Sequence, residues 1–278
     1  MKYKGLLPLL LLPMLFACEE DEDIPQPISE QVGIEDPAMA VCIDETAKNL
    51  GWKSPRQVTF VNCMQDTLMS IVGLEKFPNL RKLDIRNSAI NLLDLRALPT
   101  LEEVLIAENP MMTRINFSEN LALTKLQIWD TPLDSLDVSN LPELQHIYIN
   151  KTNIKILNTY NSPNLSYISA MKNRIQTVDF SDNDALSTIS LEFNELRTIN
   201  LETMPSLQIA VLDYNQLSSV KFAANQQLTA LHLSNNALTE INLDNNPDLL
   251  RVDLKNNPLS ENTKLYLNTI NWIPNLEW

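Results

Sequence analysis

His146 and His232 are the first candidates for acid–base or metal chemistry, because the 278-residue chain has no other histidine. They lie four units apart in the repeating pattern described below. If each unit contributes one strand to a sheet, they are separated by roughly 19 Å. The ligands of a zinc ion lie about 2 Å from the metal, so these two histidines cannot share one.

Other catalytic motifs are missing from the sequence as well. The four glycines end at Gly73, which leaves no glycine cluster to cradle a phosphate. No Gly-x-Ser-x-Gly turn presents a nucleophilic serine. Paired carboxylates on an open sheet would lack the dry surroundings that raise the pKa of a catalytic acid. We therefore predict that the chain is not an enzyme and uses no metal and no cofactor.

Aromatic side chains concentrate in the middle of the chain, where they alternate with apolar residues that face inward. This alternation places them on the outer side of neighbouring strands. Aromatic residues favour strands in general, but that preference does not explain their concentration on one face. We predict a ligand-binding face made of Trp129, Asp130, His146, Tyr148, Asn150, Tyr167, Met171, Glu192, Phe193, Val211, Asp213 and Tyr214. Aromatic and methionine residues flanked by polar ones suit protein interfaces, and the same rings suit stacking against sugars, so both classes of ligand stay open.

The element that positions these residues is a repeat with a period of 21 residues, interrupted by one interval of 22. Its first position is occupied by Leu80, Leu101, Leu123, Leu144, Leu165, Leu186, Leu207, Leu228 and Leu249. Counted from this leucine, positions 1, 4 and 6 face the core, and positions 3, 5, 7 and 8 face outward. Position 9 is Asn in six repeats and Ser or Thr in the other three. Because a buried Asn is costly unless it is fully hydrogen-bonded, we expect it to bond the backbone of its own repeat and of the next one.

The unit LxxLxLxxNxLxxLDLxxxPx resembles the leucine-rich repeat, and it covers residues 58–259. The second, apolar half of each unit is similar to the nested 21-residue bacterial (Bacteroidetes-type) variety. This resemblance implies a repeat solenoid with a parallel β-ladder on the front face and a short strand-like or irregular back face. It also implies helical caps at both ends, which a solenoid needs to cover its terminal core.

Both caps have signals of their own in the sequence. Residues 36–57 form the expected N-terminal helical cap, where Asp36 and Pro37 suit the start of a helix and Gly51 suits its end. The following segment 71–80 resembles the first repeats of internalin-like proteins. Residues 260–278 form the expected C-terminal cap, with Ser260 at the start of a helix.

Cys42 and Cys63 fall on the cap helix and on the first strand that this helix covers. Outside the cytoplasm two such cysteines can form a disulfide. They can equally serve as two small buried hydrophobic residues. Both interpretations stay open from the sequence.

The amino terminus resembles a bacterial lipoprotein signal. Lys2 and Lys4 precede a short apolar run that ends in Leu15-Phe16-Ala17-Cys18, which matches the lipobox. The resemblance implies a signal peptide over residues 1–17 and a lipid on Cys18. Residues 18–35 are expected to be an acidic, extended linker. Its acidic start, residues 19–23, resembles the surface-export signal of Bacteroidetes-type lipoproteins, which implies the outer membrane with the protein facing the cell exterior.

The net charge of −14 disfavours nucleic acid and anionic lipid as partners. We therefore expect membrane contact only through the lipid on Cys18, and a monomeric protein. The expected function is recognition of a protein partner through the front strands, in adhesion or in interaction with a host or another cell. Capture of a glycan, and a structural surface role without a specific ligand, are the alternatives.

Overall fold

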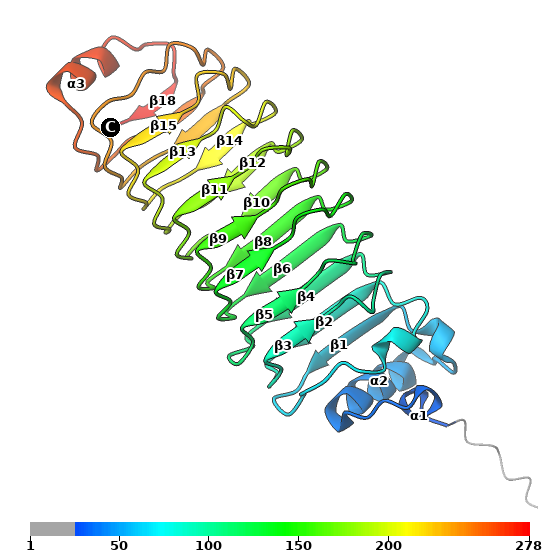
Figure 1. Ribbon diagram of the computed structural model, residues 1–278. Helices are drawn as coiled ribbons and strands as arrows, with labels where there is room; N and C mark the ends of the chain where they lie inside the picture. Colours follow the sequence, from blue (N-terminus) through cyan, green and yellow to red (C-terminus); the bar gives the residue numbers. More distant parts are fainter. Residues whose placement is uncertain (1–25) are drawn as a thin grey trace, which may run out of the picture.

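The computed structural model describes residues 26–278, which form one elongated parallel β-solenoid (Figure 1). The solenoid confirms the predicted leucine-rich repeat architecture. The predicted signal peptide and Cys18 lie outside the described residues. Within residues 26–278, no helix is both long enough and apolar enough to cross a membrane.

The front face is a single sheet of eleven parallel strands, to which every repeat contributes one (Figure 1). In sheet order these are β1 (Phe60–Met64), β2 (Lys82–Arg86), β4 (Glu103–Ala107), β6 (Lys125–Trp129), β8 (His146–Asn150), β10 (Tyr167–Ser169), β12 (Thr188–Ser190), β14 (Ile209–Val211), β16 (Ala230–His232), β17 (Arg251–Asp253) and β18 (Asn275–Glu277). Neighbouring strands pair in register, so that Tyr167 lies opposite His146 on one side and Thr188 on the other. The repeated leucine is buried in all nine repeats, and this common anchor keeps every repeat in the same register.

The back face carries shorter strands that form three separate ladders. Its strands are β3 (Leu92–Asp94), β5 (Arg114–Asn116), β7 (Ser135–Asp137), β9 (Ile156–Asn158), β11 (Thr177–Asp179), β13 (Thr198–Asn200) and β15 (Ser219–Lys221). The ladders pair β3 with β5, β7 with β9 and β11, and β13 with β15. The back face is thus made of short strands, as one of the two predicted alternatives had it, but its ladder is interrupted between β5 and β7 and between β11 and β13.

Two columns of buried asparagines tie the repeats together. In the first column, at position 9, Asn215 Nδ2 donates to the carbonyl of Leu191 in the preceding repeat and to that of Leu212 in its own. Its Oδ1 accepts from the backbone N–H of Leu196, again in the preceding repeat. Our expectation of a bond to the next repeat was therefore wrong in direction, because the side chain leans back toward the turn that precedes it.

The second column lies near the end of the repeat, three residues before the repeated leucine, and sequence reasoning missed it. It consists of Asn120, Asn183, Asn225 and Asn246. Each Nδ2 donates to two carbonyls of the preceding repeat. These amides satisfy backbone acceptors that would otherwise be buried without a partner.

The amino-terminal cap consists of α1 (Ile28–Val32), α2 (Pro37–Leu50) and two 3-10 turns, Pro55–Gln57 and Leu74–Lys76. Helix α2 begins after Asp36 and ends at Gly51, as predicted, and it packs on β1 (Figure 1). Helix α1 lies where we expected an extended linker. It forms because Ile28 is buried against the cap and because Ser29 donates two hydrogen bonds to Asp44 of α2.

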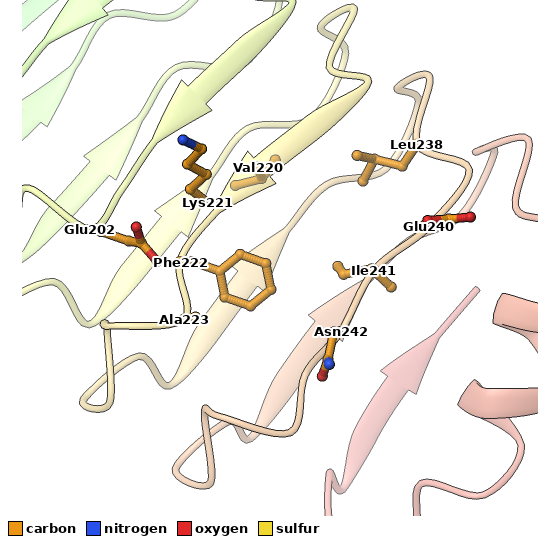
Figure 2. Close-up of a pocket in the computed structure, with 9 residues that line it drawn as sticks. All are labelled: Glu202, Val220, Lys221, Phe222, Ala223, Leu238, Glu240, Ile241 and Asn242. Atoms are coloured by element: carbon orange, nitrogen blue, oxygen red, sulfur yellow. The ribbon is translucent and has the colours of Figure 1, made fainter.

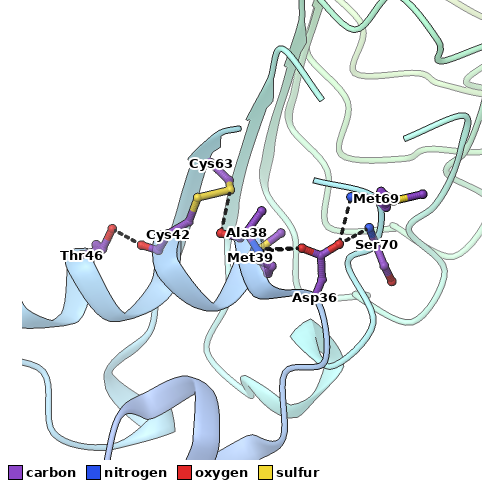
Figure 3. Close-up of a disulfide and its surroundings, with 8 residues drawn as sticks. All are labelled: Asp36, Ala38, Met39, Cys42, Thr46, Cys63, Met69 and Ser70. Carbon is purple, nitrogen blue, oxygen red and sulfur yellow. Dashed lines mark hydrogen bonds between the residues drawn. A yellow bond between two sulfur atoms is a disulfide. The ribbon is translucent and has the colours of Figure 1, made fainter. Parts of the chain in front are cut away.

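A disulfide joins Cys42 of α2 to Cys63 of β1, with 5.3 Å between their Cα atoms (Figure 3). Beside it, the buried carboxylate of Asp36 accepts hydrogen bonds from both sides. Its Oδ1 accepts from the backbone N–H groups of Ala38 and Met39, and its Oδ2 accepts from those of Met69 and Ser70. This one side chain therefore both caps α2 and attaches it to the loop after β1 (Figure 3).

The carboxyl-terminal cap contains α3 (Glu261–Leu267), which begins after Ser260 as predicted. The Ser260 hydroxyl accepts from the backbone N–H of Thr263. Tyr266 attaches α3 to the last repeats, because its hydroxyl accepts from the backbone N–H of Leu243 and donates to Asp244. Strand β18 was not predicted, and it extends the front sheet by one strand beyond the last repeat.

Candidate functional site

The front sheet brings three predicted residues, His146, Tyr148 and Tyr167, together with Lys125, which was not predicted. We call this group the tyrosine cluster. The rings of Tyr148 and Tyr167 are 5.1 Å apart, and the ring of His146 is 6.3 Å from Tyr167. The ammonium of Lys125 lies 5.8 Å from the centre of the Tyr148 ring, at cation–π distance. These side chains are half-buried. Lys125, His146 and Tyr167 are register partners on neighbouring strands, and Tyr148 lies two residues further along its strand, so that it contacts Lys125 and Tyr167 diagonally.

The surroundings of Tyr167 keep its phenol neutral. Burial raises the pKa of Tyr167, and the neighbouring Tyr148 and Glu192 raise it further. A neutral phenol can donate a hydrogen bond as well as accept one. The cluster thus combines apolar ring faces with hydroxyl groups, a combination common at protein interfaces.

A second group lies at the carboxyl ends of the front strands, and we call it the turn stack: Lys172, Phe193 and Tyr214. All three occupy position 8 of consecutive repeats. The rings of Phe193 and Tyr214 stack almost in parallel, 4.3 Å apart and with 9° between their planes. The Lys172 ammonium lies 5.6 Å from the centre of the Phe193 ring. Phe193 and Tyr214 are 43% and 49% exposed, so nearly half of each residue is open to solvent.

Several predicted polar residues are held by hydrogen bonds to the neighbouring repeat. Asn150 Oδ1 accepts from the backbone N–H of Met171 and from the hydroxyl of Ser169. Asp213 Oδ1 accepts from the backbone N–H and the hydroxyl of Ser234, at 2.7 and 2.6 Å. Asn150 therefore acts mainly as a link between repeats, whereas Asp213 keeps its second oxygen free for another contact.

Trp129 and Asp130 are separate from both groups. Trp129 is half-buried at the end of β6, and within residues 26–278 no ring contact joins it to the tyrosine cluster or to the turn stack. Asp130 forms an exposed ion pair with Lys151 at 3.2 Å. The remaining predicted residues Met171 and Val211 are half-buried on the same face. The structure thus places the predicted face in two compact groups and an isolated tryptophan.

Charged groups on the front sheet are paired at its two ends. Lys82 pairs with Glu103, Arg86 with Asp84, and Lys255 with Glu277. Glu192 and Asp213, which flank the turn stack, have no basic partner within 4 Å among the described residues. Among the described residues, the side-chain carboxylate of Glu192 accepts a hydrogen bond only from the Ser190 hydroxyl.

Three surface cavities lie on the back face, and each coincides with an interruption of the back ladders. Their volumes are about 540 Å³ between β5 and β7, about 390 Å³ between β11 and β13, and about 270 Å³ beyond β15. Figure 2 shows the last of these, where the Phe222 ring lies between Val220 and Ile241. Their positions indicate imperfect stacking of the back strands. Among the described residues, no group of three His, Cys, Asp or Glu side chains could hold a metal ion.

Sequence reasoning missed the two lysines of these groups and the serines that hold the acids. Lys125 and Lys172 precede their aromatic partners by 23 and 21 residues, respectively, which is about one repeat. Ser234 follows Asp213 by the same interval of 21. A search for complementary residues one repeat apart would have found the Lys172–Phe193 and Asp213–Ser234 pairs, and a search that also allowed a diagonal offset of two residues would have found Lys125–Tyr148.

Solved structures with the same fold include two internalins from Listeria monocytogenes. The functional domain of InlJ is 24% identical over 85% of this chain and 53% of that chain, with a TM-score of 0.71. The present chain therefore matches about half the length of that domain. InlP is 21% identical over 84% of this chain and 72% of that one, with a TM-score of 0.65.

A third similar chain comes from the octameric complex of Latrophilin 3, Unc5D and the leucine-rich repeat region of FLRT2. It is 16% identical over 78% of this chain and 82% of that one, with a TM-score of 0.60. No protein-family model and no curated protein matches the sequence. The shared architecture shows that the chain is a leucine-rich repeat solenoid with an internalin-like fold.

Proposed function

We propose that the chain is a lipid-anchored surface protein that binds a protein partner through the front face of its repeats. The tyrosine cluster is the observation that supports this most strongly. It gathers three rings and a cation on adjacent strands, and such aromatic groups supply most of the binding energy at many protein interfaces. The presence of a similar solenoid chain in a multi-protein complex agrees with this function.

The test replaces Trp129, Tyr148 and Tyr167 together by alanine and measures binding to a captured surface protein. We expect at least a hundredfold loss, because truncation of a central aromatic residue commonly costs about 2 kcal/mol or more. The matched control replaces Leu92, Ile156 and Tyr160 on the back, which are each more than half exposed. Equal binding by the front variant and the unmodified protein would contradict the proposal.

Glycan capture is the second candidate, because the same rings lie beside amide and carboxylate groups that could bond to sugar hydroxyls. A glycan array and a pull-down of surface proteins, run with the same preparation, separate the two. Reproducible glycan binding that the front variant abolishes, with no protein captured, would replace the first candidate. If both assays remain negative under conditions where the protein is folded, a structural role without a specific ligand becomes the better interpretation.

The lipid anchor and the outward orientation rest on the sequence around Cys18. We expect the Cys18→Ala variant to lose incorporation of labelled palmitate, whereas a Cys42→Ala/Cys63→Ala variant keeps it. Protease added to intact cells should remove the repeats if the protein faces the exterior. Palmitate labelling that persists without Cys18 would refute the lipid anchor. Full protection of the repeats from protease in intact cells would refute the outward orientation.

A further inference from the structure

Position 8 has a left-handed backbone in all nine repeats, with φ between 47° and 57°. This conformation crowds the Cβ of every residue except glycine, and Asn and Asp tolerate it best. The nine residues are Asn87, Glu108, Asp130, Lys151, Lys172, Phe193, Tyr214, Asn235 and Asn256. Phe193 and Tyr214 are the only bulky rings among them. Both residues are exposed and neither belongs to the core, so burial in the core does not offset the backbone strain.

The turn stack leaves one ring face open. The Phe193 ring has the Lys172 ammonium near it and the Tyr214 ring against it. Because Phe193 belongs to the repeat before Tyr214, the second face of Tyr214 is directed toward Asn235 in the following repeat. The side chain of Asn235 is engaged elsewhere: its Nδ2 donates to Ser234 and its Oδ1 accepts from Asn256. No aromatic or basic group of the described residues contacts this face.

The residue before Tyr214 is an acid, Asp213. The two hydrogen bonds from Ser234 draw the Asp213 carboxylate toward the following repeat, on the same side as the open face of Tyr214. Asp213 Oδ2 has no hydrogen-bond donor and no basic partner in residues 26–278. The neighbouring Glu192 also lacks a basic partner there, which adds negative potential at this point. An open ring face and a fixed, unpaired carboxylate together complement a planar cation.

We propose that Tyr214 and Asp213 form a subsite for an arginine side chain of the protein partner. The guanidinium would stack on the open Tyr214 face and donate a hydrogen bond to the free Oδ2 of Asp213. A lysine ammonium offers no flat face that could stack on the ring, so arginine fits better. This inference rests on the proposed function, since it assigns the chemistry that one part of the front face recognises.

The probe is a dye-labelled peptide, Gly-Arg-Gly-Arg-Gly, titrated against the full chain by fluorescence anisotropy. Two peptides of the same length carry lysine or citrulline in place of arginine. We expect the arginine peptide to bind at least threefold more tightly than the lysine peptide, and the neutral citrulline peptide to bind more weakly than both. Equal affinity for arginine and citrulline would overturn the assignment, and so would equal affinity for arginine and lysine.

Tyr214→Asn and Asp213→Asn are the informative variants. Asn suits the left-handed turn at position 214, and at position 213 it keeps an acceptor for Ser234, so both variants should fold. We expect each to weaken binding of the arginine peptide roughly three- to thirtyfold. Asp137→Asn on the back removes the same charge and should leave the affinity unchanged. Equal losses in Asp137→Asn and Asp213→Asn would show attraction to net charge alone and refute the subsite.

The same variants separate failure of the subsite from failure of the proposed function. If Tyr214→Asn and Asp213→Asn bind a captured partner normally while the Trp129, Tyr148 and Tyr167 variant does not, only the arginine subsite is wrong. If no front-face variant affects the partner, the proposed function itself is wrong. A thermal melt of each variant that shows a folded protein excludes unfolding as the cause of lost binding.

Discussion

Asp36→Asn should loosen the amino-terminal cap without unfolding the repeats. Asp36 is 8% exposed, and its carboxylate accepts hydrogen bonds from four backbone N–H groups, at 2.9 and 3.1 Å from α2 and at 2.9 Å from both Met69 and Ser70. An amide keeps one acceptor oxygen and turns an NH₂ group toward two of these donors. The variant therefore loses two hydrogen bonds to a charged acceptor, each worth about 1.5–3 kcal/mol, for a total of about 3–6 kcal/mol.

Hydrogen exchange of single amides measures this loss where it occurs. If the remaining oxygen keeps the cap of α2, the N–H groups of Met69 and Ser70 become unprotected. A loss of about 3 kcal/mol makes their exchange at least a hundredfold faster, since 1.4 kcal/mol corresponds to a factor of ten. The amide of Ile128, deep in the repeats, should keep its rate, because each repeat of a solenoid contacts only its neighbours.

Asp36→Ser and Asp179→Asn complete the experiment. A serine can still cap α2 but is too short to reach both segments, so it should expose the same two amides. Asp179→Asn makes the same replacement of a carboxylate by an amide at an exposed position, and it should leave the exchange rates of the Met69 and Ser70 amides unchanged. Less than a threefold acceleration at the Met69, Ser70, Ala38 and Met39 amides in Asp36→Asn would refute the claim that this carboxylate holds the cap.

Three further changes test the caps, the repeats and the surface charges. Asn215→Leu leaves buried backbone groups in two repeats without partners and should lower the free energy of unfolding in urea by about 3–5 kcal/mol; a change below 1 kcal/mol would contradict the role of the asparagine column. Cys42→Ala/Cys63→Ala removes the disulfide, whose cysteines are 21 residues apart in the sequence, and should lower the stability of the amino-terminal cap by about 3 kcal/mol. A reductant that lowers the stability of the unmodified protein and of this variant equally would refute that prediction. Arg96→Ala removes the side-chain hydrogen bond that lowers the pKa of Asp94 and should raise that pKa in a ¹³C NMR titration, though not fully, because the backbone bond from residue 96 remains. The folded-state pKa of Asp94 is lowered, so the stability that its carboxylate contributes is present above its pKa in the unfolded chain and is lost as the pH falls through its folded-state pKa. An unchanged titration of Asp94 in the variant would show that the Arg96 contact is absent in solution.

The solenoid and its inward-facing side chains were predictable because the same pattern of apolar positions occurs in nine repeats. A leucine every 21 residues indicates that equivalent residues of successive repeats stack on one another. The same stacking explains why the asparagine at position 9 is buried. The start of α2 was predictable from Asp36 and Pro37, because capping is a local interaction. The interrupted back ladders were not, because whether two short strands pair depends on small shifts that accumulate along the stack.

The candidate face was predictable in composition and less so in arrangement. Alternation along each strand placed Tyr148 and Tyr167 on the front correctly. Their separation from Phe193 and Tyr214 depends on the left-handed turn at position 8, which directs these two rings away from the sheet. That turn has a weak signal in the sequence, since Asn and Asp occupy the position in four of nine repeats.

By itself, the sequence determined the fold, the inward and outward direction of most side chains, and the starts of the cap helices α2 and α3, because each depends on local chemistry or on repetition. It also carried the signals at the amino terminus that predict a lipid anchor. Only the tertiary structure decided which outward residues meet. Parallel strands in register bring residues 21 positions apart into contact, so Lys172, Phe193 and Tyr214 form one stack although a full turn of the solenoid separates each from the next. Whether Asp213 and Glu192 are paired or free was likewise decided by their neighbours in adjacent repeats.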